Sequence, residues 1–156
     1  MTDSGTSALD GALRIAGRWM TPPPPQTFEQ LQNLVQAYAL FADAGLRAQV
    51  SQLFTADAVW DGTSLGYGTA VGADGIAAHV CMHHRVAEPM MHLPGPPLLS
   101  AVTDSEVHGV TWCMATRWAD GTTRPVIYFY YEDGFRRGED GSWRFCRRQL
   151  HAAFPM

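Results

Sequence analysis

The stretch TFEQLQNLVQAYALFADAG, residues 27–45, decides how the fold begins. Its apolar residues recur at intervals of three to four positions, which places them on one face of a helix. They are Phe28, Leu31, Val35, Tyr38 and Ala42. Thr27 and Gln30 have the spacing of a capping box, and Gly45 is typical of the left-handed residue that follows a helix. The pattern therefore predicts a helix over residues 28–43.

The segments after this helix change from helical to extended character. Residues 46–54 and 73–86 favour two further helices, with a short strand over 56–60 between them. Extended segments bounded by turn residues then follow, over 90–93, 98–102, 106–118, 124–135 and 142–154. This order predicts an α+β fold, a cone-shaped α+β barrel in which a strongly curved antiparallel sheet wraps around the N-terminal helices. Such a cone has an apolar cavity at its open end.

Alternation along the long strands indicates that both faces of the sheet are apolar. One face of the 106–118 segment carries Val107, Gly109, Thr111, Cys113 and Ala115. The other face carries His108, Val110, Trp112, Met114 and Thr116. Helices cover one face, so we expect another copy of the chain to cover the other face in a homo-oligomer.

Length and composition suit one compact domain. The chain has 156 residues, of which 46% are hydrophobic. Residues 1–26 contain the run Pro22–Pro25 and are expected to form an N-terminal arm and proline-rich linker, and residues 27–156 the domain itself. No apolar run approaches the roughly 18 residues that span a bilayer, and acidic residues stand where a signal peptide has positive charge. We expect a cytoplasmic protein without a membrane partner.

Charge and motif content exclude several classes of function. All eleven basic residues are arginine, so a lysine Schiff base and a lysine-containing phosphate loop are impossible. The net charge is −4 and the arginines are scattered, which argues against a nucleic-acid partner. No glycine-rich dinucleotide motif and no serine nucleophile elbow is present. Acid–base chemistry without a cofactor remains, or no chemistry at all.

Asp43 and His92 are the candidates for acid–base chemistry. Asp43 lies in the last turn of the predicted helix, where the negative end of the helix dipole makes a carboxylate more basic. His92 lies between apolar residues and needs a hydrogen-bond partner if it is buried. A His–Asp pair in an apolar cavity suits proton removal beside a carbonyl. The alternatives are that Asp43 only shapes its turn and that His92 is a structural residue.

A metal site is the other possibility in the third predicted helix. His79 and His83 are one helical turn apart, with Cys81 between them and His84 next in sequence. A catalytic zinc site normally has three protein ligands, and no third ligand is evident here. We therefore expect no metal and no other cofactor.

Several aromatic and cationic residues are candidates for binding a substrate. Tyr38 lies on the helix that ends at Asp43, and Trp60 ends the short strand. Tyr128, Tyr130 and Tyr131 lie on one predicted strand, and any of them could donate a hydrogen bond to a substrate oxygen, with packing in the sheet as the alternative. Cations come from two groups around the last hairpin, with a solvated strand face as the alternative explanation. These are Arg136 and Arg137 before the hairpin and Arg144, Arg147 and Arg148 after it.

Several segments together resemble the SnoaL-like branch of the nuclear transport factor 2-like superfamily. The resemblance covers residues 27–154 and is most specific in LFTADAVWDG (53–62) and YEDGFRRGEDGSWRF (131–145). Further similar pieces are LVQAYALFADAG (34–45), GTAVGADGIAAHV (68–80) and MMHL (90–93). The resemblance implies a cone-shaped α+β barrel that is usually a dimer or trimer.

The resemblance also implies roles for individual residues. In dehydratase and dehydrochlorinase members, a His–Asp dyad transfers the proton, and His92 and Asp43 stand at those two places. Tyr38 resembles a tyrosine that lines the pocket, and Arg136 or Arg137 the pocket arginine of the dehydrochlorinase. The implied function is a cofactor-independent lyase of the dehydratase type, or an isomerase, acting on a small hydrophobic cyclic molecule.

Two departures and two alternatives accompany this expectation. The first departure from the family pattern is the run Pro94–Pro97, which begins two residues after His92. The second is a third helix that is unusually rich in histidine, which leaves His83 or His84 as substitutes for His92 at the pocket mouth. The first alternative function is a polyketide-type cyclase that uses the same dyad. The second is a non-catalytic module that binds a ligand or serves as an oxygenase small subunit.

Overall fold

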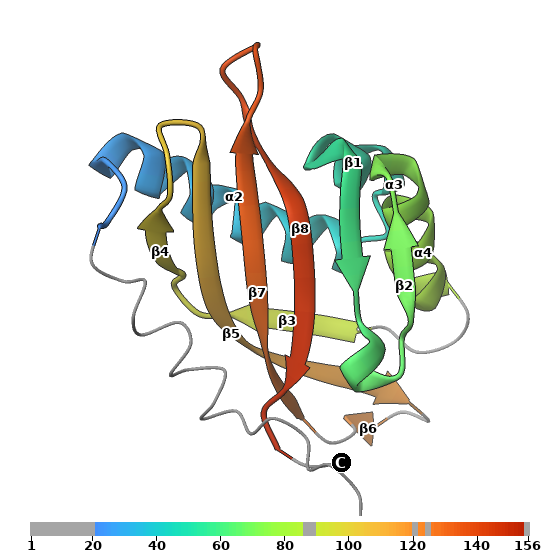
Figure 1. Ribbon diagram of the computed structural model, residues 1–156. Helices are drawn as coiled ribbons and strands as arrows, with labels where there is room; N and C mark the ends of the chain where they lie inside the picture. Colours follow the sequence, from blue (N-terminus) through green and yellow to red (C-terminus); the bar gives the residue numbers. More distant parts are fainter. Residues whose placement is uncertain (1–20, 86–89, 120–121, 124–125, 155–156) are drawn as a thin grey trace, which may run out of the picture.

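The computed structural model describes residues 21–85, 90–119, 122–123 and 126–154. Three helices and a short 3-10 helix are interleaved with eight strands (Figure 1). The helical elements are α2 (Pro25–Asp43), α3 (Arg47–Gln52), η1 (Thr63–Leu65) and α4 (Ala73–Arg85). The strands are β1 (Phe54–Asp61), β2 (Thr69–Val71), β3 (Met90–Pro94), β4 (Leu98–Ala101), β5 (Glu106–Ala119), β6 (Thr122–Thr123), β7 (Ile127–Arg137) and β8 (Trp143–Ala152). The predicted helices and long strands are all present.

The first helix begins earlier than predicted. Its N-cap is Pro24, which makes no side-chain cap hydrogen bond, and Pro25 is its first residue. Thr27 is therefore inside the first turn, and the predicted capping box is wrong. Proline suits this position because its fixed φ is helical and its missing N–H would have no partner there. The C-terminal prediction is confirmed, since Gly45 has a φ of 67° directly after the helix.

The sheet is curved and open, and its strand order is β2-β1-β8-β7-β5-β3, with β4 and β6 also paired to β5. The α+β class is confirmed, but two details of the expected barrel are wrong. The sheet does not close on itself, and β1 pairs with β8 in parallel, so the sheet is mixed. These two strands come from opposite ends of the domain and no hairpin joins them, so the antiparallel geometry of a tight turn is not imposed.

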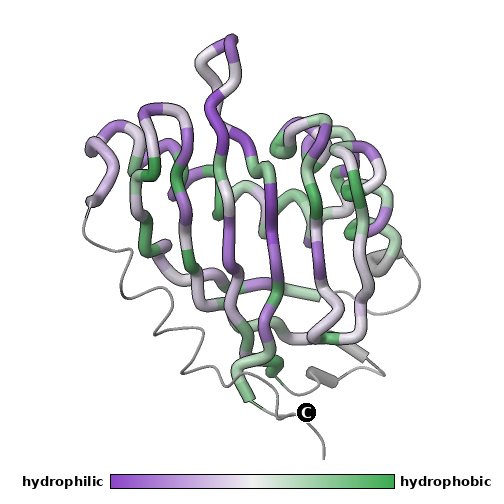
Figure 2. Tube along the Cα trace, viewed as in Figure 1, coloured by the Kyte–Doolittle hydropathy of each residue, from purple (hydrophilic) through white to green (hydrophobic). Residues whose placement is uncertain are grey.

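Helix α2 runs across one face of the sheet, while α3 and α4 lie beside β1 and β2 (Figure 1). The predicted alternation of β5 is confirmed, because Val107, Thr111, Cys113 and Ala115 are all buried on the helix side. Both hydrophobic and hydrophilic positions occur along the strands of the sheet (Figure 2). The opposite face of β5 exposes Trp112, which has 55% of its surface accessible, and Met114.

Three small elements were not predicted, namely η1, β2 and β6. The first 20 residues of the predicted arm lie outside the described residues, and the last two residues of that range, Pro25 and Gln26, belong to α2. In the part of the chain that the structure describes, every helix is too short or too polar to span a membrane.

Candidate active site

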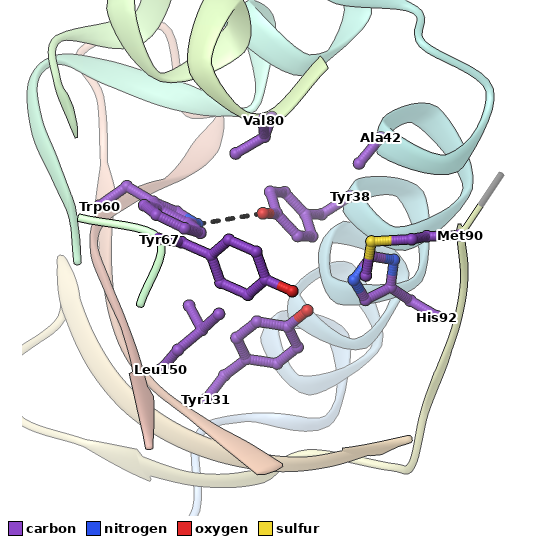
Figure 3. Close-up of a pocket in the computed structure, with 9 residues that line it drawn as sticks. All are labelled: Tyr38, Ala42, Trp60, Tyr67, Val80, Met90, His92, Tyr131 and Leu150. Atoms are coloured by element: carbon purple, nitrogen blue, oxygen red, sulfur yellow. Dashed lines mark hydrogen bonds between the residues drawn. The ribbon is translucent and has the colours of Figure 1, made fainter. Parts of the chain in front are cut away.

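A small cavity lies between α2, α4 and the helix-facing side of the sheet (Figure 3). Its volume is about 50 Å³. A cavity that holds a benzene ring measures about 150 Å³, so a ring-sized ligand must displace part of the lining. The lining is mostly apolar and aromatic, and it consists of Tyr38, Ala42, Trp60, Tyr67, Val80, Met90, His92, Tyr131 and Leu150.

Asp43 and His92 meet at this cavity although 49 positions separate them in sequence. Nδ1 of His92 lies 2.5 Å from Oδ1 of Asp43, and the backbone N–H of His92 donates to Oδ2 at 2.7 Å. The side chain of His92 is 13% exposed and that of Asp43 is 18% exposed. The last residue of α2 is thus connected to the middle of β3 by both oxygens of one carboxylate, which fixes the position of the imidazole.

This contact determines the chemistry that the imidazole can offer. A carboxylate accepts hydrogen bonds, so it favours the form of His92 that carries the proton on Nδ1. In that form Nε2 is the ring nitrogen that carries a lone pair, and His92 is one of the residues that line the cavity. The edge of the His92 ring also meets Phe129, with ring centroids 6.2 Å apart and planes at 89°.

Tyr38 provides a hydrogen-bond donor on the α2 side of the cavity. The indole N–H of Trp60 donates to its hydroxyl oxygen over 3.1 Å, the interaction drawn as a dashed line in Figure 3. Burial raises the pKa of Tyr38 to about 12, although the nearby Arg148 opposes this rise. The phenol therefore stays protonated at neutral pH. Since Trp60 occupies an oxygen lone pair, the Tyr38 O–H is available for donation.

A buried ion pair between Arg148 and Asp133 packs against Tyr38 and Tyr131. Arg148 in β8 is fully buried, and its Nε and Nη2 donate to the two oxygens of Asp133, each over 2.8 Å. Its guanidinium carbon lies 4.2 Å from the ring centre of Tyr38 and 3.9 Å from that of Tyr131. Burial disfavours the charge, but the attraction of Asp133, its hydrogen bonds with Arg148 and the nearby Tyr131 and Tyr38 together outweigh burial and raise the pKa of Arg148. The guanidinium is a cation under the cavity wall that stays charged.

The structure places three of the residues predicted to bind substrate away from the cavity. The side chain of Arg136 is outside it and pairs with the exposed Asp57 over 3.0 Å. Arg137 donates to the backbone oxygen of Gly141 in the β7–β8 hairpin. Tyr128 lies on the outer face of the sheet with 48% of its surface exposed. Among the described arginines, it is Arg148 that lies against the tyrosines of the cavity wall; it is one of the five arginines around the last hairpin that were candidates.

The histidine cluster of the third helix is only partly described. His79 bonds through Nε2 to the backbone oxygen of Tyr67 over 2.9 Å. The side chains of His83 and His84 lie outside the described residues. Within the described ranges, no three His, Cys, Asp or Glu side chains converge as metal ligands. Tyr131, one of the three strand tyrosines considered as hydrogen-bond donors to a substrate, lines the cavity. Tyr67 also lines it and was not predicted to bind substrate, because its aromatic character was the only sequence signal.

Family and structural comparisons agree with this architecture. Residues 26–149 match the SnoaL-like domain. The chain belongs to the SnoaL-like domain family. No curated protein matches the sequence significantly.

Three solved structures are informative neighbours of this chain. A protein of Novosphingobium aromaticivorans assigned as an aromatic ring hydroxylase has a TM-score of 0.76 and 21% identity, covering 85% of this chain and 93% of its own. Another from the same organism, assigned as a scytalone dehydratase, has a TM-score of 0.69 and 19% identity, with coverages of 81% and 83%. LinA has a TM-score of 0.68 and 19% identity, with coverages of 92% and 90%. At these identities the likeness establishes the fold.

Proposed function

We propose that this SnoaL-like protein is a cofactor-independent lyase of the dehydratase type, or an isomerase, that acts on a small hydrophobic cyclic molecule. The observation that carries the proposal is the 2.5 Å contact between His92 and Asp43 at the wall of an apolar cavity. The fold shared with a protein assigned as a scytalone dehydratase supports the same reaction class.

The reaction begins with proton abstraction. His92 Nε2 takes a proton from a ring carbon next to a carbonyl group, and the C–H electron pair moves into an enolate. Asp43 stabilises the imidazolium that forms and keeps its ring oriented. Tyr38 donates a hydrogen bond to the enolate oxygen, where negative charge develops.

Dehydration completes the sequence. The enolate re-forms the carbonyl, its electron pair makes a carbon–carbon double bond, and the bond to a β-hydroxyl breaks. The imidazolium of His92 returns its proton to the departing hydroxyl, which leaves as water. If the proton returns to a different carbon instead, the same groups carry out an isomerisation. Neither path consumes an oxidant or a cofactor.

The test is turnover of a panel of hydroxylated cyclic ketones by purified protein, followed by mass spectrometry. His92→Ala and Asp43→Asn are each expected to lower kcat by about 10²–10⁴-fold, the contribution of a positioned acid–base group. Asp57→Asn is the matched control, because this carboxylate pairs with Arg136 away from the cavity. Turnover that survives both dyad substitutions overturns the proposal.

A second candidate is a non-catalytic module that binds a partner subunit. The exposed Trp112, Met114 and Tyr128 on the outer face of the sheet favour it. If the protein is a lyase, we propose that the same face joins copies of the chain in a homodimer or homotrimer. Sedimentation of the purified protein distinguishes the two functions, because a non-catalytic module is expected to be a monomer that assembles only with a different chain.

A further inference from the structure

The segment between β1 and β2, Gly62–Gly68, forms a compact turn at the cavity. The backbone N–H of Gly62 donates to the oxygen of Gly68 over 2.8 Å, and that of Tyr67 donates to the oxygen of Gly62 over 3.0 Å. Gly66 and Gly68 have φ values of 80° and 72°, which residues with a Cβ seldom adopt. The turn therefore closes on itself and presents Tyr67, between two left-handed glycines, to the cavity (Figure 3).

Neighbouring elements hold this turn on two sides. His79 of α4 bonds through Nε2 to the backbone oxygen of Tyr67 over 2.9 Å. Because a carbonyl only accepts hydrogen bonds, this nitrogen carries a proton. On the other side, the Ser64 hydroxyl donates to the backbone oxygen of Leu150 in β8 over 2.7 Å. The position of Tyr67 therefore depends on α4 as well as on the sheet.

His79 also packs against the indole that orients Tyr38. The rings of His79 and Trp60 lie 5.1 Å apart with an interplanar angle of 57°, and Trp60 donates to the Tyr38 hydroxyl. One histidine side chain thus contacts both the turn that carries Tyr67 and the side chain that holds Tyr38. This explains a histidine on this helix without a metal ion.

The hydroxyls of Tyr67 and Tyr131 point into the same part of the cavity, on the side that faces His92 (Figure 3). Burial raises the pKa of Tyr131 well above its usual value, so this phenol stays protonated. Among the described lining residues, none carries a permanent charge. The arrangement suits an uncharged ring that bears an oxygen atom, and it disfavours a carboxylate.

We propose that Tyr67 and Tyr131 form a subsite for a carbonyl or phenolic oxygen of the ligand, and that His79 is the positioning residue of Tyr67. The subsite rests on the proposed function, because its ligand is the substrate of the His92–Asp43 pair. It makes the substrate an uncharged cyclic molecule with two oxygens: the ketone oxygen next to the reacting carbon is bound by Tyr38, and a second oxygen, a carbonyl or a phenolic hydroxyl, is bound by Tyr67 and Tyr131.

Phenol and toluene are the probes, since they have nearly the same shape and differ in one hydroxyl group. NMR titration of the full-length protein is expected to show tighter binding of phenol. Tyr67→Phe should weaken phenol binding by about 2–10-fold, the value of one net hydrogen bond, and leave toluene binding within about twofold. Equal affinity of the wild-type protein for both probes overturns the subsite, as does an unchanged phenol preference in Tyr67→Phe.

Two His79 variants test positioning. His79→Phe keeps a ring against Trp60 but loses the hydrogen bond to Tyr67, so it should reproduce the loss of phenol preference. The double variant with Tyr67→Phe should show no further loss, because both changes act on one interaction. His79→Gln keeps a donor and should largely restore the preference. Additive losses, or equal weakening of phenol and toluene, contradict positioning and indicate a general structural role.

The same titration in Asp43→Asn separates this proposal from the proposed function. Phenol preference should persist in that variant, since Asp43 is not among the described residues that line the cavity and acts through His92. A preference that persists in Asp43→Asn, together with no turnover of any ketone by the wild-type protein, supports the subsite and counts against the lyase. Turnover without any phenol preference supports the lyase and overturns the subsite.

Discussion

Replacing Arg148 with methionine is expected to destabilise the protein strongly. The guanidinium is fully buried, donates two hydrogen bonds of 2.8 Å to Asp133, and lies 3.9–4.2 Å from the centres of three aromatic rings. Among the described residues, none accepts a hydrogen bond from its third nitrogen, Nη1, so the pair already carries an unsatisfied donor. Methionine removes the cation and leaves the Asp133 carboxylate buried without its partner.

The magnitude follows from that uncompensated carboxylate. Removing one member of a buried ion pair costs about 3–5 kcal/mol. A domain of this kind has a free energy of unfolding of roughly 5–15 kcal/mol, so the variant is expected to lose a large share of its stability. Replacing both members, Asp133→Leu with Arg148→Met, should recover much of the loss, because no charge then remains buried.

Urea unfolding at neutral pH measures both effects. Arg144→Met is the matched control, because Arg144 lies in the same strand and its ion pair with Asp140 is solvent-exposed. No measurable change in the free energy of unfolding is expected for this variant. A loss below about 1 kcal/mol for Arg148→Met would refute the reasoning, because it would place the pair among ordinary surface salt bridges. A double variant less stable than Arg148→Met would also contradict it.

Three further predictions concern pH, packing and assembly. The pKa of Tyr38 in the folded protein is about 12, against an ordinary value of 10.0. The stability that its protonated form contributes is therefore present below pH 10.0 and declines as the pH rises toward 12. Urea unfolding across this range should show a shallower decline in Tyr38→Phe than in the wild type, and an equal decline contradicts the assignment. In Gly62→Ala, the new Cβ would lie 2.7 Å from Cζ3 of Trp60, so the indole should shift. Phenol binding is then expected to weaken by several-fold. Unchanged titration curves would show that the indole moves without any effect on binding. Trp112→Glu on the exposed sheet face should dissociate the proposed homo-oligomer in sedimentation experiments, and an unaltered sedimentation profile would exclude this face as the interface.

Local periodicity was sufficient to predict the helices and the long strands. The last turn of α2 also identified Asp43, because a carboxylate at a helix C-terminus is unfavourable unless another group compensates. Its contact with His92 was expected from the family resemblance and is present in the structure. The parallel pairing of β1 with β8 had no local signal, since it depends on how the two ends of the domain meet.

The inward position of Arg148 was not predictable from strand alternation. Phe145 faces the core, so simple alternation turns Arg147 inward and Arg148 outward. The pairing of β7 with β8 shifts between Gly134 and Phe135, which leaves Cys146 as an extra residue and reverses the alternation beyond it. Arg148 is buried for this reason, and Arg147 is exposed.

The position of Tyr67 depends on tertiary contacts in the same way. Its turn contains Gly66 and Gly68, which predict a loop but no direction for the side chain between them. The bonds from His79 to the backbone of Tyr67 and from Ser64 to the backbone of Leu150 help to hold it at the cavity.

Hydrogen exchange at carbon tests most directly whether His92 removes a proton with the help of Asp43. Cyclohexanone is incubated with the protein in deuterated water, and deuterium incorporation next to the carbonyl is followed by NMR. The wild-type protein is expected to accelerate exchange over buffer, with the acceleration lost in His92→Ala and reduced by about 10²-fold or more in Asp43→Asn. Exchange at the same rate in the wild type and His92→Ala would contradict the assignment of His92 as the base.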